Sequence, residues 1–272
     1  MALPQGKWVK LEQNGAGPGA RSSHAVAVVG QKAYAFGGEF SPRVPVDNHL
    51  YVFDLTTRTW KVADARGDIP PPRVGVMMAS IAEIIYVFGG CGDAGRLNDL
   101  WAYDVVDRKW IGFPPPGEKC KPRGGPGLAS VQGKIWVVYG FSGEELDDVH
   151  CFDPRAGRWS CVETTGEKPT PRSMFSSVGI GKHIFIHGGE IDPSDLGHLG
   201  AGKFSKEVYA LDTETKEWKR WDNDEPGSAP GERGWCAFSG GQCNKRPGLL
   251  VYGGNSPSND RLDDIYFFTP SI

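Results

Sequence analysis

An apolar run that ends in a glycine pair recurs along this chain, and no other feature constrains the fold as strongly. The copies are AYAFGG (33–38), IYVFGG (85–90), IFIHGG (184–189) and LLVYGG (249–254), with WVVYGF (136–141) as a variant that keeps one glycine. After a loop, each copy is followed by a second apolar run that ends in aspartate or a substitute: LYVFD (50–54), LWAYD (100–104), VHCFD (149–153), VYALD (208–212) and IYFFT (265–269). Regular self-similarity is the signature of a repeat architecture. The sequence therefore predicts five copies of one supersecondary unit.

Two further residue types recur in step with the glycines. A tryptophan falls six residues after each of the four aspartates, at Trp60, Trp110, Trp159 and Trp218. The fifth unit ends before it reaches one, and Trp8 at the other end of the chain is the candidate for the unfilled position. An arginine precedes the first apolar run of each unit, at spacings of 52, 50, 49 and 61 residues: Arg21, Arg73, Arg123, Arg172 and Arg233.

A period of about 50 residues with short strands, a double glycine and a spaced tryptophan resembles the kelch repeat. The resemblance covers nearly the whole chain and implies an all-β fold, a kelch β-propeller of five four-stranded blades in a single domain over residues 1–272. The blades are expected at about 21–60, 73–110, 123–159, 172–218 and 233–269, with an N-terminal strand at 5–13 closing the last blade so that no edge stays open. Kelch propellers usually have six or seven blades. Three alternatives therefore stay open: a closed five-bladed ring, a dimer of open arcs, and a chain that lacks one blade.

The repeat also predicts structural roles for its residues. The glycines are expected at positive φ, where a Cβ would clash, and the tryptophans between neighbouring blades. The favoured role of the arginines is to bind backbone carbonyls at blade junctions. The alternative is a ring of arginines at the channel mouth that binds an anion such as sulfate. The histidines outside the long loop, His24, His49, His150, His183 and His187, are expected to be structural or surface residues.

Composition and charge exclude several classes of function. The 33 acidic and 30 basic residues leave a net charge of −3 with no basic run, so nucleic acid is not an expected partner. No apolar stretch has the length of a membrane span, and the N-terminus lacks the apolar run of a signal peptide. The six cysteines show no C-x-x-C spacing and are expected to be reduced. We expect a cytoplasmic protein, with the nucleus as a second possible location.

The loop of the fourth unit differs from the others. Between the glycine pair, or its single-glycine equivalent, and the next apolar run, the five loops hold 11, 9, 8, 18 and 10 residues. The excess of the fourth loop, 190–207, contains Glu190, Asp192, Asp195 and His198. Carboxylate and imidazole ligands suit ferrous iron, manganese or zinc. The alternative is ordinary turn chemistry. Glu39 also follows a glycine pair, so a glutamate at position 190 is equally consistent with a feature of the repeat.

Longer stretches resemble one group of kelch proteins. GGEIDPSDLGHLGAGKF (188–204), EVYALDTETKEW (207–218), GPGARSSHAVAVVGQKAYAFGGE (17–39) and GKIWVVYGF (133–141) are similar to the plant specifier proteins, which comprise nitrile-specifier, epithiospecifier and thiocyanate-forming proteins. The resemblance implies that ferrous iron engages the sulfur of aglycones that myrosinase releases from glucosinolates, and directs them to nitriles and away from isothiocyanates. One whole blade of that family has no counterpart near residues 80–90 of this chain.

The iron motif of the family, E-x-x-x-D-x-x-x-H, is matched at its first and last positions by Glu190 and His198. Ser194 stands at the middle position, and Asp195 is the neighbouring carboxylate. The resemblance thus implies Glu190, Asp195 and His198 as metal ligands and an Fe(II)-dependent, lyase-like specifier activity. The alternative function is that of a non-catalytic kelch propeller whose loops bind a protein partner.

Overall fold

A computed structural model describes residues 13–195, 200, 202–222, 229–243 and 245–270. These residues form strands, turns and loops. A helix long and apolar enough to cross a bilayer does not occur in this described part of the chain.

The strands of the first two repeats form two sheets. The first sheet contains β1 (Asn14–Gly15), β2 (Ser22–Val29), β3 (Lys32–Glu39), β4 (Leu50–Asp54) and β5 (Thr59–Val62). The second contains β6 (Met77–Ile81), β7 (Ile84–Phe88), β10 (Leu100–Asp104) and β11 (Lys109–Gly112), and its loop carries the small ribbon of β8 (Cys91–Gly92) and β9 (Gly95–Arg96).

The other three repeats each form a sheet as well. The third sheet contains β12 (Gly127–Val131), β13 (Lys134–Phe141), β14 (Glu145–Asp153) and β15 (Arg158–Cys161). The fourth contains β16 (Thr165–Gly166), β17 (Ser176–Ile180), β18 (His183–His187), β21 (Val208–Asp212) and β22 (Glu217–Arg220), with the ribbon β19 (Glu190–Asp192) and β20 (Lys203–Phe204) in its long loop. The described strands of the fifth are β23 (Ala237–Cys243), β24 (Arg246–Asn255) and β25 (Arg261–Phe268).

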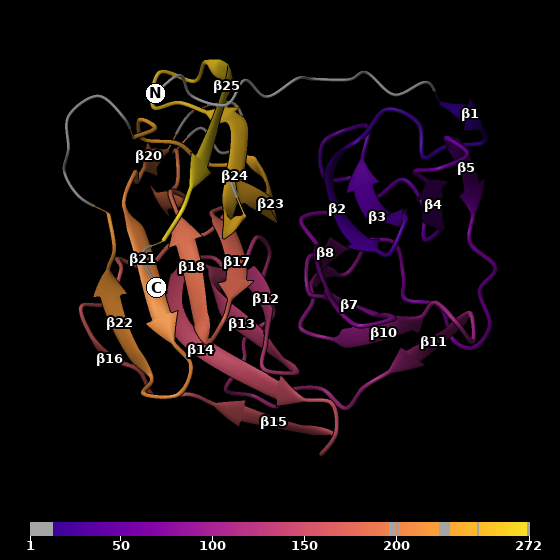
Figure 1. Cartoon of the computed structure of the whole chain (residues 1–272), viewed down its shortest axis with the longest axis horizontal. Helices are drawn as coiled ribbons and strands as arrows, with labels where there is room; N and C mark the ends of the chain where they lie inside the picture. The colour runs from indigo at the N-terminus through magenta and orange to yellow at the C-terminus, as the bar shows by residue number, and fades with distance from the viewer. Residues whose placement is uncertain (1–12, 196–199, 201, 223–228, 244, 271–272) are drawn as a thin grey trace.

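The five sheets are the blades of a β-propeller arrangement, which confirms the predicted fold class (Figure 1). Neighbouring strands within each blade are antiparallel, except that β1 and β16 add short parallel strands to the outer edges of blades one and four. The first strands of successive blades contact one another in the order β2, β6, β12, β17 and β23. The strand expected at 5–13, with Trp8, lies outside the described residues except for Gln13, which accepts a hydrogen bond from the Trp60 indole at 2.7 Å.

The aspartates that end the third strands form the turns that the repeat needs. In blade one, Oδ1 of Asp54 accepts the backbone N–H groups of Thr56 and Thr57, both at 2.9 Å. Asp104, Asp153 and Asp212 bond in the same way to the residues two and three positions on. A short carboxylate that binds its own backbone favours a tight turn. After the turn the chain runs back as the fourth strand, in which the tryptophan pairs with a residue of the third strand.

Three of the four repeat tryptophans pack between blades, as the sequence predicts, whereas the Trp60 ring lies 4.9 Å from Phe53 of its own blade. Trp110 of blade two lies 5.6 Å from the Phe36 ring of blade one, and Trp159 of blade three lies 5.8 Å from Phe88 of blade two. In the next junction Trp218 lies 5.7 Å from the ring of Tyr139. Aromatic pairs at these centroid distances add to the burial of apolar area. The core of the protein is therefore a series of inter-blade layers.

The blade arginines are buried and structural. Arg73 and Arg123 have no exposed surface; each donates to the carbonyl oxygen of the residue before the second glycine and forms a bidentate pair with an aspartate, Asp99 or Asp148. Arg21 and Arg233 pair in the same way with Asp47 and Asp264. Arg172 bonds to Gly188 O and Ser205 Oγ, with Glu207 at 3.9 Å. Because their guanidinium groups are bonded within the blades, the described arginines do not form the alternative anion-binding ring.

The glycine pairs adopt positive φ, as predicted. At Gly38, with φ of 98°, a Cβ would lie 2.6 Å from the carbonyl oxygen of Ser22. The single-glycine variant shows what replaces a glycine. Tyr139 keeps a positive φ of 56°, is fully buried, and places its ring against Trp218.

Candidate functional site

Five turns meet around the axis of the blades. They lie two residues after each blade arginine and share φ values between 52° and 63°: Ser23, Gly75, Gly125, Met174 and Trp235. We call them the axial turns. Backbone hydrogen bonds link them in order, from Gly75 N to Ser23 O, then around to the bond from Trp235 N to Met174 O, at 2.9 to 3.2 Å. The side chains beside these turns form the inner part of one end of the propeller.

A second set of residues surrounds the axial turns. Each follows the last glycine of its repeat and forms a backbone pair with the residue after a blade arginine: Glu39, Cys91, Phe141, Glu190 and Asn255. We call them the rim residues. Glu190 exchanges backbone hydrogen bonds with Ser173 at 2.8 and 2.9 Å. These backbone hydrogen bonds therefore hold Glu190 at the end of the propeller where the axial turns lie, which we call the mouth. Glu39 occupies the equivalent position in blade one.

The two rim glutamates have different hydrogen-bond partners. Glu39 accepts a hydrogen bond at 2.8 Å from the hydroxyl of Ser23, the axial turn of its own blade. In blade four the axial turn is Met174, which has no donor in its side chain. The Glu190 carboxylate instead accepts the backbone N–H of Gly202, at the far end of the long loop. A small residue is needed there, since a Cβ on Gly202 would lie 2.3 Å from Oε1 of Glu190. The loop is thus closed onto Glu190.

The base of the long loop is a two-stranded ribbon. β19 and β20 pair Glu190 with Phe204 and Asp192 with Lys203, and the Asp192 carboxylate forms a 2.7 Å ion pair with the Lys203 ammonium. Asp195 is exposed in the turn that follows. His198 lies outside the described residues. Among those described, no three His, Cys, Asp or Glu side chains form a group that could hold a metal ion.

Glu145 is a functional candidate that the sequence reasoning missed. It begins β14 opposite the rim residue Phe141, and its Oε1 accepts a hydrogen bond from Ser173 Oγ at 3.1 Å. Its Oε2 is buried without a hydrogen-bond partner. Burial raises the pKa of Glu145 to about 8, and the charges of Glu190 and Asp192 act in the same direction. Burial also raises the pKa of Glu190, with a further contribution from Asp192. No sequence motif marks Glu145, because its position depends on how blades three and four pack.

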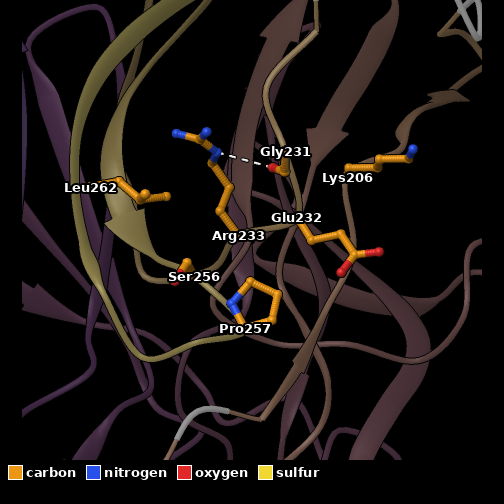
Figure 2. A pocket seen from close by; sticks show the side chains of 7 residues that line it. All are labelled: Lys206, Gly231, Glu232, Arg233, Ser256, Pro257 and Leu262. Carbon is orange, nitrogen blue, oxygen red and sulfur yellow. Dashed lines mark hydrogen bonds between the residues drawn. The ribbon is translucent and has the colours of Figure 1, made fainter. Parts of the chain in front are cut away.

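A hollow of about 450 Å³ opens beside the end of the long loop, between blades four and five (Figure 2). Its lining is Lys206, Gly231, Glu232, Arg233, Ser256, Pro257 and Leu262. Lys206 is exposed, whereas the Arg233 guanidinium is bound by Gly231 O, Gly253 O and Asp264. The hollow therefore offers one accessible cation, a short apolar wall and hydroxyl and backbone groups.

Comparisons with known proteins agree with this architecture. Residues 1–189 match the KLHDC2/KLHL20/DRC7 Kelch-repeats domain, and residues 171–220 match the Kelch motif. The chain is 37% identical to N-(sulfonatooxy)prop-2-enimidothioate sulfolyase of Thlaspi arvense, over 97% of this chain and 97% of that protein. It is 28% identical to human Kelch domain-containing protein 3, over 92% of this chain and 68% of the relative.

The alignment with the Thlaspi arvense protein runs over 339 residues, whereas this chain has 272, so the relative carries at least 67 aligned residues without a counterpart here. That excess is larger than any repeat of this chain, the longest of which spans 61 residues. The relative therefore has room for one more blade. The matched domain, the repeat and the end-to-end similarity show that this chain is a member of the kelch-repeat family and a relative of the sulfolyase.

Proposed function

We propose that this protein is a specifier-like protein that acts on glucosinolate aglycones and directs their breakdown toward nitriles. The observation that carries the proposal is the end-to-end similarity to a sulfolyase, combined with a half-buried glutamate at the propeller mouth. The substrate in the relative's name carries a sulfate ester on nitrogen and a thiolate on the adjacent carbon. Loss of the sulfate and the sulfur leaves a nitrile. Migration of the side chain from carbon to nitrogen leaves an isothiocyanate.

Ferrous iron is the proposed cofactor, and Glu190, Asp195 and His198 are its proposed ligands. Two carboxylates and one imidazole suit Fe(II). A cation at this position is supported by the two carboxyl groups of Glu190 and Glu145, which lie at the mouth of the propeller and both have a raised pKa. A nearby positive charge would favour the ionised forms of these carboxyl groups. When bound, iron would supply a Lewis acid for the sulfur of the aglycone.

The chain's own groups provide for binding and orientation. The hollow beside the long loop has a volume in the range of small-molecule sites, and the Lys206 ammonium can pair with the sulfate of the aglycone. The Gly202 N–H bond holds the Glu190 carboxylate toward the loop.

An anaerobic product assay tests this function. Purified protein is incubated with ferrous iron, myrosinase and allyl glucosinolate, and nitrile is measured against isothiocyanate. We expect nitrile above an iron-only control, with loss of that excess in Glu190→Gln and His198→Ala. Glu39→Gln is the matched control, since it removes a rim carboxylate of blade one and should retain the activity. A product ratio equal to that of iron alone would refute the proposal.

The second candidate function is a protein-interaction module. It is favoured by an exposed apolar patch on the loop of blade one, formed by Phe40, Val44 and Val46. Apolar residues grouped on a surface loop mark interaction sites. Wild-type protein and a Phe40→Ser/Val44→Ser variant are each immobilised on a resin and incubated with plant extract, and the proteins that each retains are compared. A protein retained by the wild type alone would support an interaction role, and identical retention by both would oppose it.

A further inference from the structure

The loop of blade one, residues 39–49, exposes three apolar side chains beside the mouth. Phe40, Val44 and Val46 are 78%, 58% and 45% exposed, and we call these three residues the apolar patch. Apolar side chains grouped on one loop gain free energy when a partner removes them from water. The patch alone does not say which partner that is. The charged groups around it do.

Arg43 lies at the tip of the same loop, in a turn that holds its backbone. The N–H of Val44 donates to the carbonyl oxygen of Ser41 at 3.0 Å, with Pro42 and Arg43 as the two central residues of the turn. Arg43 has a φ of 64°, and glycine or asparagine is favoured at that place in a turn with proline before it. The carboxylate of Glu39 accepts the backbone N–H of Arg43. An arginine kept in such a conformation by a tethered backbone points to a role for its side chain.

A second arginine reaches the same region from blade two. Arg96 pairs with Cys91 across the β8–β9 ribbon, and its guanidinium carbon lies 4.9 Å from the centre of the Phe141 ring, the rim residue of blade three. Burial raises the pKa of Cys91, and the positive charges of Arg96 and Arg43 act in the opposite direction. Both guanidinium groups therefore act on one thiol at the rim of blade two.

These two arginines differ from the blade arginines in having their donors available. Among the residues that the structure describes, neither guanidinium forms an ion pair or a hydrogen bond, and both side chains are exposed. The rim carboxylate of this loop, Glu39, already accepts the Ser23 hydroxyl and the Arg43 N–H. A planar guanidinium binds a carboxylate through two parallel hydrogen bonds. The surface thus presents two cations with unused donors beside exposed apolar side chains.

We propose that the apolar patch, together with Arg43 and Arg96, is a docking surface for a segment of a partner protein in which an aspartate or glutamate stands beside a large apolar side chain. The carboxylate pairs with the guanidinium groups, and the apolar side chain packs on Phe40 and Val44. Charge complementarity selects an acidic segment over a basic one, and the apolar patch selects a protein segment over a free anion. The proposal extends the second candidate function by giving the chemistry of the partner, and it does not depend on the specifier activity.

The construction of the surface favours binding without a large cost of ordering. The N–H of Val46 donates to Gly38 O at 3.0 Å, and Glu39 and Pro45 form a backbone bridge, so the loop is fastened to its blade on both sides of the Arg43 turn. The Phe141 ring supports one face of the Arg96 guanidinium. Groups that are already held in place lose less conformational freedom when a partner binds.

Panning of a random heptapeptide library displayed on phage tests the surface. The wild type is expected to enrich peptides that carry Asp or Glu next to a large apolar residue. For an enriched peptide labelled with fluorescein, fluorescence anisotropy should show a dissociation constant raised at least about 10-fold by Arg43→Glu, by Arg96→Glu and by Phe40→Ser. Arg58→Glu is the matched control, since it makes the same charge change at an exposed arginine with positive φ in the β4–β5 turn, and it should leave the affinity unchanged.

Reversing the charge on the peptide makes the test specific for the ion pairs. A peptide with lysine in place of its acidic residue should bind the wild type weakly and should bind Arg96→Glu better than the wild type does. If Arg96→Glu fails to fold by circular dichroism, Arg96→Gln replaces it in the affinity measurement. The proposal is overturned if no peptide is enriched, if the enriched peptides lack acidic residues, or if Arg58→Glu weakens binding as much as the other variants. Retention of a plant protein through Phe40 and Val44 without any preference for acidic peptides would keep the interaction role and still overturn this inference.

Discussion

The buried ion pair between Arg123 and Asp148 offers the sharpest test of what holds the blades together. The guanidinium is fully buried, and Nη2 lies 2.8 Å from Oδ2 of Asp148. Asp148 also bonds to His150 at 2.7 Å. Asp148→Ala leaves the buried charge of Arg123 with only the carbonyl oxygens of Lys121 and Tyr139. Breaking one partner of a buried pair costs about 3–5 kcal/mol.

The control is a pair with the same separation and a different environment. Arg108 and Asp64 also lie 2.8 Å apart, but their side chains are 60% and 70% exposed. Asp64→Ala should cost at most about 1 kcal/mol, because water and salt screen an exposed pair. For a chain of this size, 1 kcal/mol corresponds to roughly 2–4 °C in Tm. Asp148→Ala should therefore lower Tm by about 6–20 °C, and Asp64→Ala by no more than about 4 °C.

Thermal denaturation followed by circular dichroism measures both variants, and acid adds a second readout. Burial favours the neutral form of Asp148, but the hydrogen bonds from Arg123 and His150 outweigh it and hold its pKa well below the usual value. A lowered folded-state pKa stabilises the protein above the unfolded pKa of about 3.9, and this stabilisation is lost as the pH falls toward the folded value. The gap between wild type and Asp148→Ala should be full at pH 7 and narrow below about pH 4. Equal Tm losses for Asp148→Ala and Asp64→Ala would refute this account.

Three further predictions concern buried positions of the blades, and urea denaturation measures each. Trp218→Ala should lower the free energy of unfolding by about 3–5 kcal/mol, because it empties the fully buried layer against Tyr139; a loss below about 1 kcal/mol would contradict that packing. His187 is buried with both ring nitrogens unbonded, and burial, followed by the charge of Arg233, lowers its pKa to about 4. The stability that neutral His187 contributes is present above about pH 6.5 and is lost as the pH falls toward 4. His187→Phe should therefore reduce the decline in the free energy of unfolding between those pH values, and an unchanged dependence of that free energy on pH would contradict this prediction. Gly189→Ala should destabilise the protein clearly more than Gly133→Ala, since both glycines have positive φ but only at Gly189 would the Cβ lie 2.7 Å from the carbonyl oxygen of Ser173.

The sequence pattern was sufficient to predict much of the structural role of the repeat. The glycine pairs, the strand-ending aspartates and the spaced tryptophans depend on interactions within a few residues or on a constant period, so they can be read from one chain. The structural role of the arginines was also the favoured interpretation. Their partners were not predicted, because Asp99 and Asp148 follow their arginines by 26 and 25 residues and meet them only when the blade is folded.

The residues of the candidate site also differ in whether the sequence could predict them. Glu190 was found from the length of its loop and a family motif, and the structure places it at the mouth. Asp195 is exposed and His198 lies outside the described residues, so the metal site stays a prediction. Glu145 could not be found, since its pKa is raised by burial in the folded structure and further by the charge of Glu190 on the adjoining blade, neither of which a sequence motif marks.

By itself the sequence determined the unit, its number of copies and the residues that make each blade, because the strand alternation, the turn chemistry and the period are local properties of the chain. Only the tertiary structure decided which faces are covered. Phe36 and Tyr252 stand at the same position of their repeats, yet one is buried and the other is 42% exposed. The reason is that burial depends on the neighbour that packs against a residue, and the neighbour of the last blade is set by how the series of blades ends.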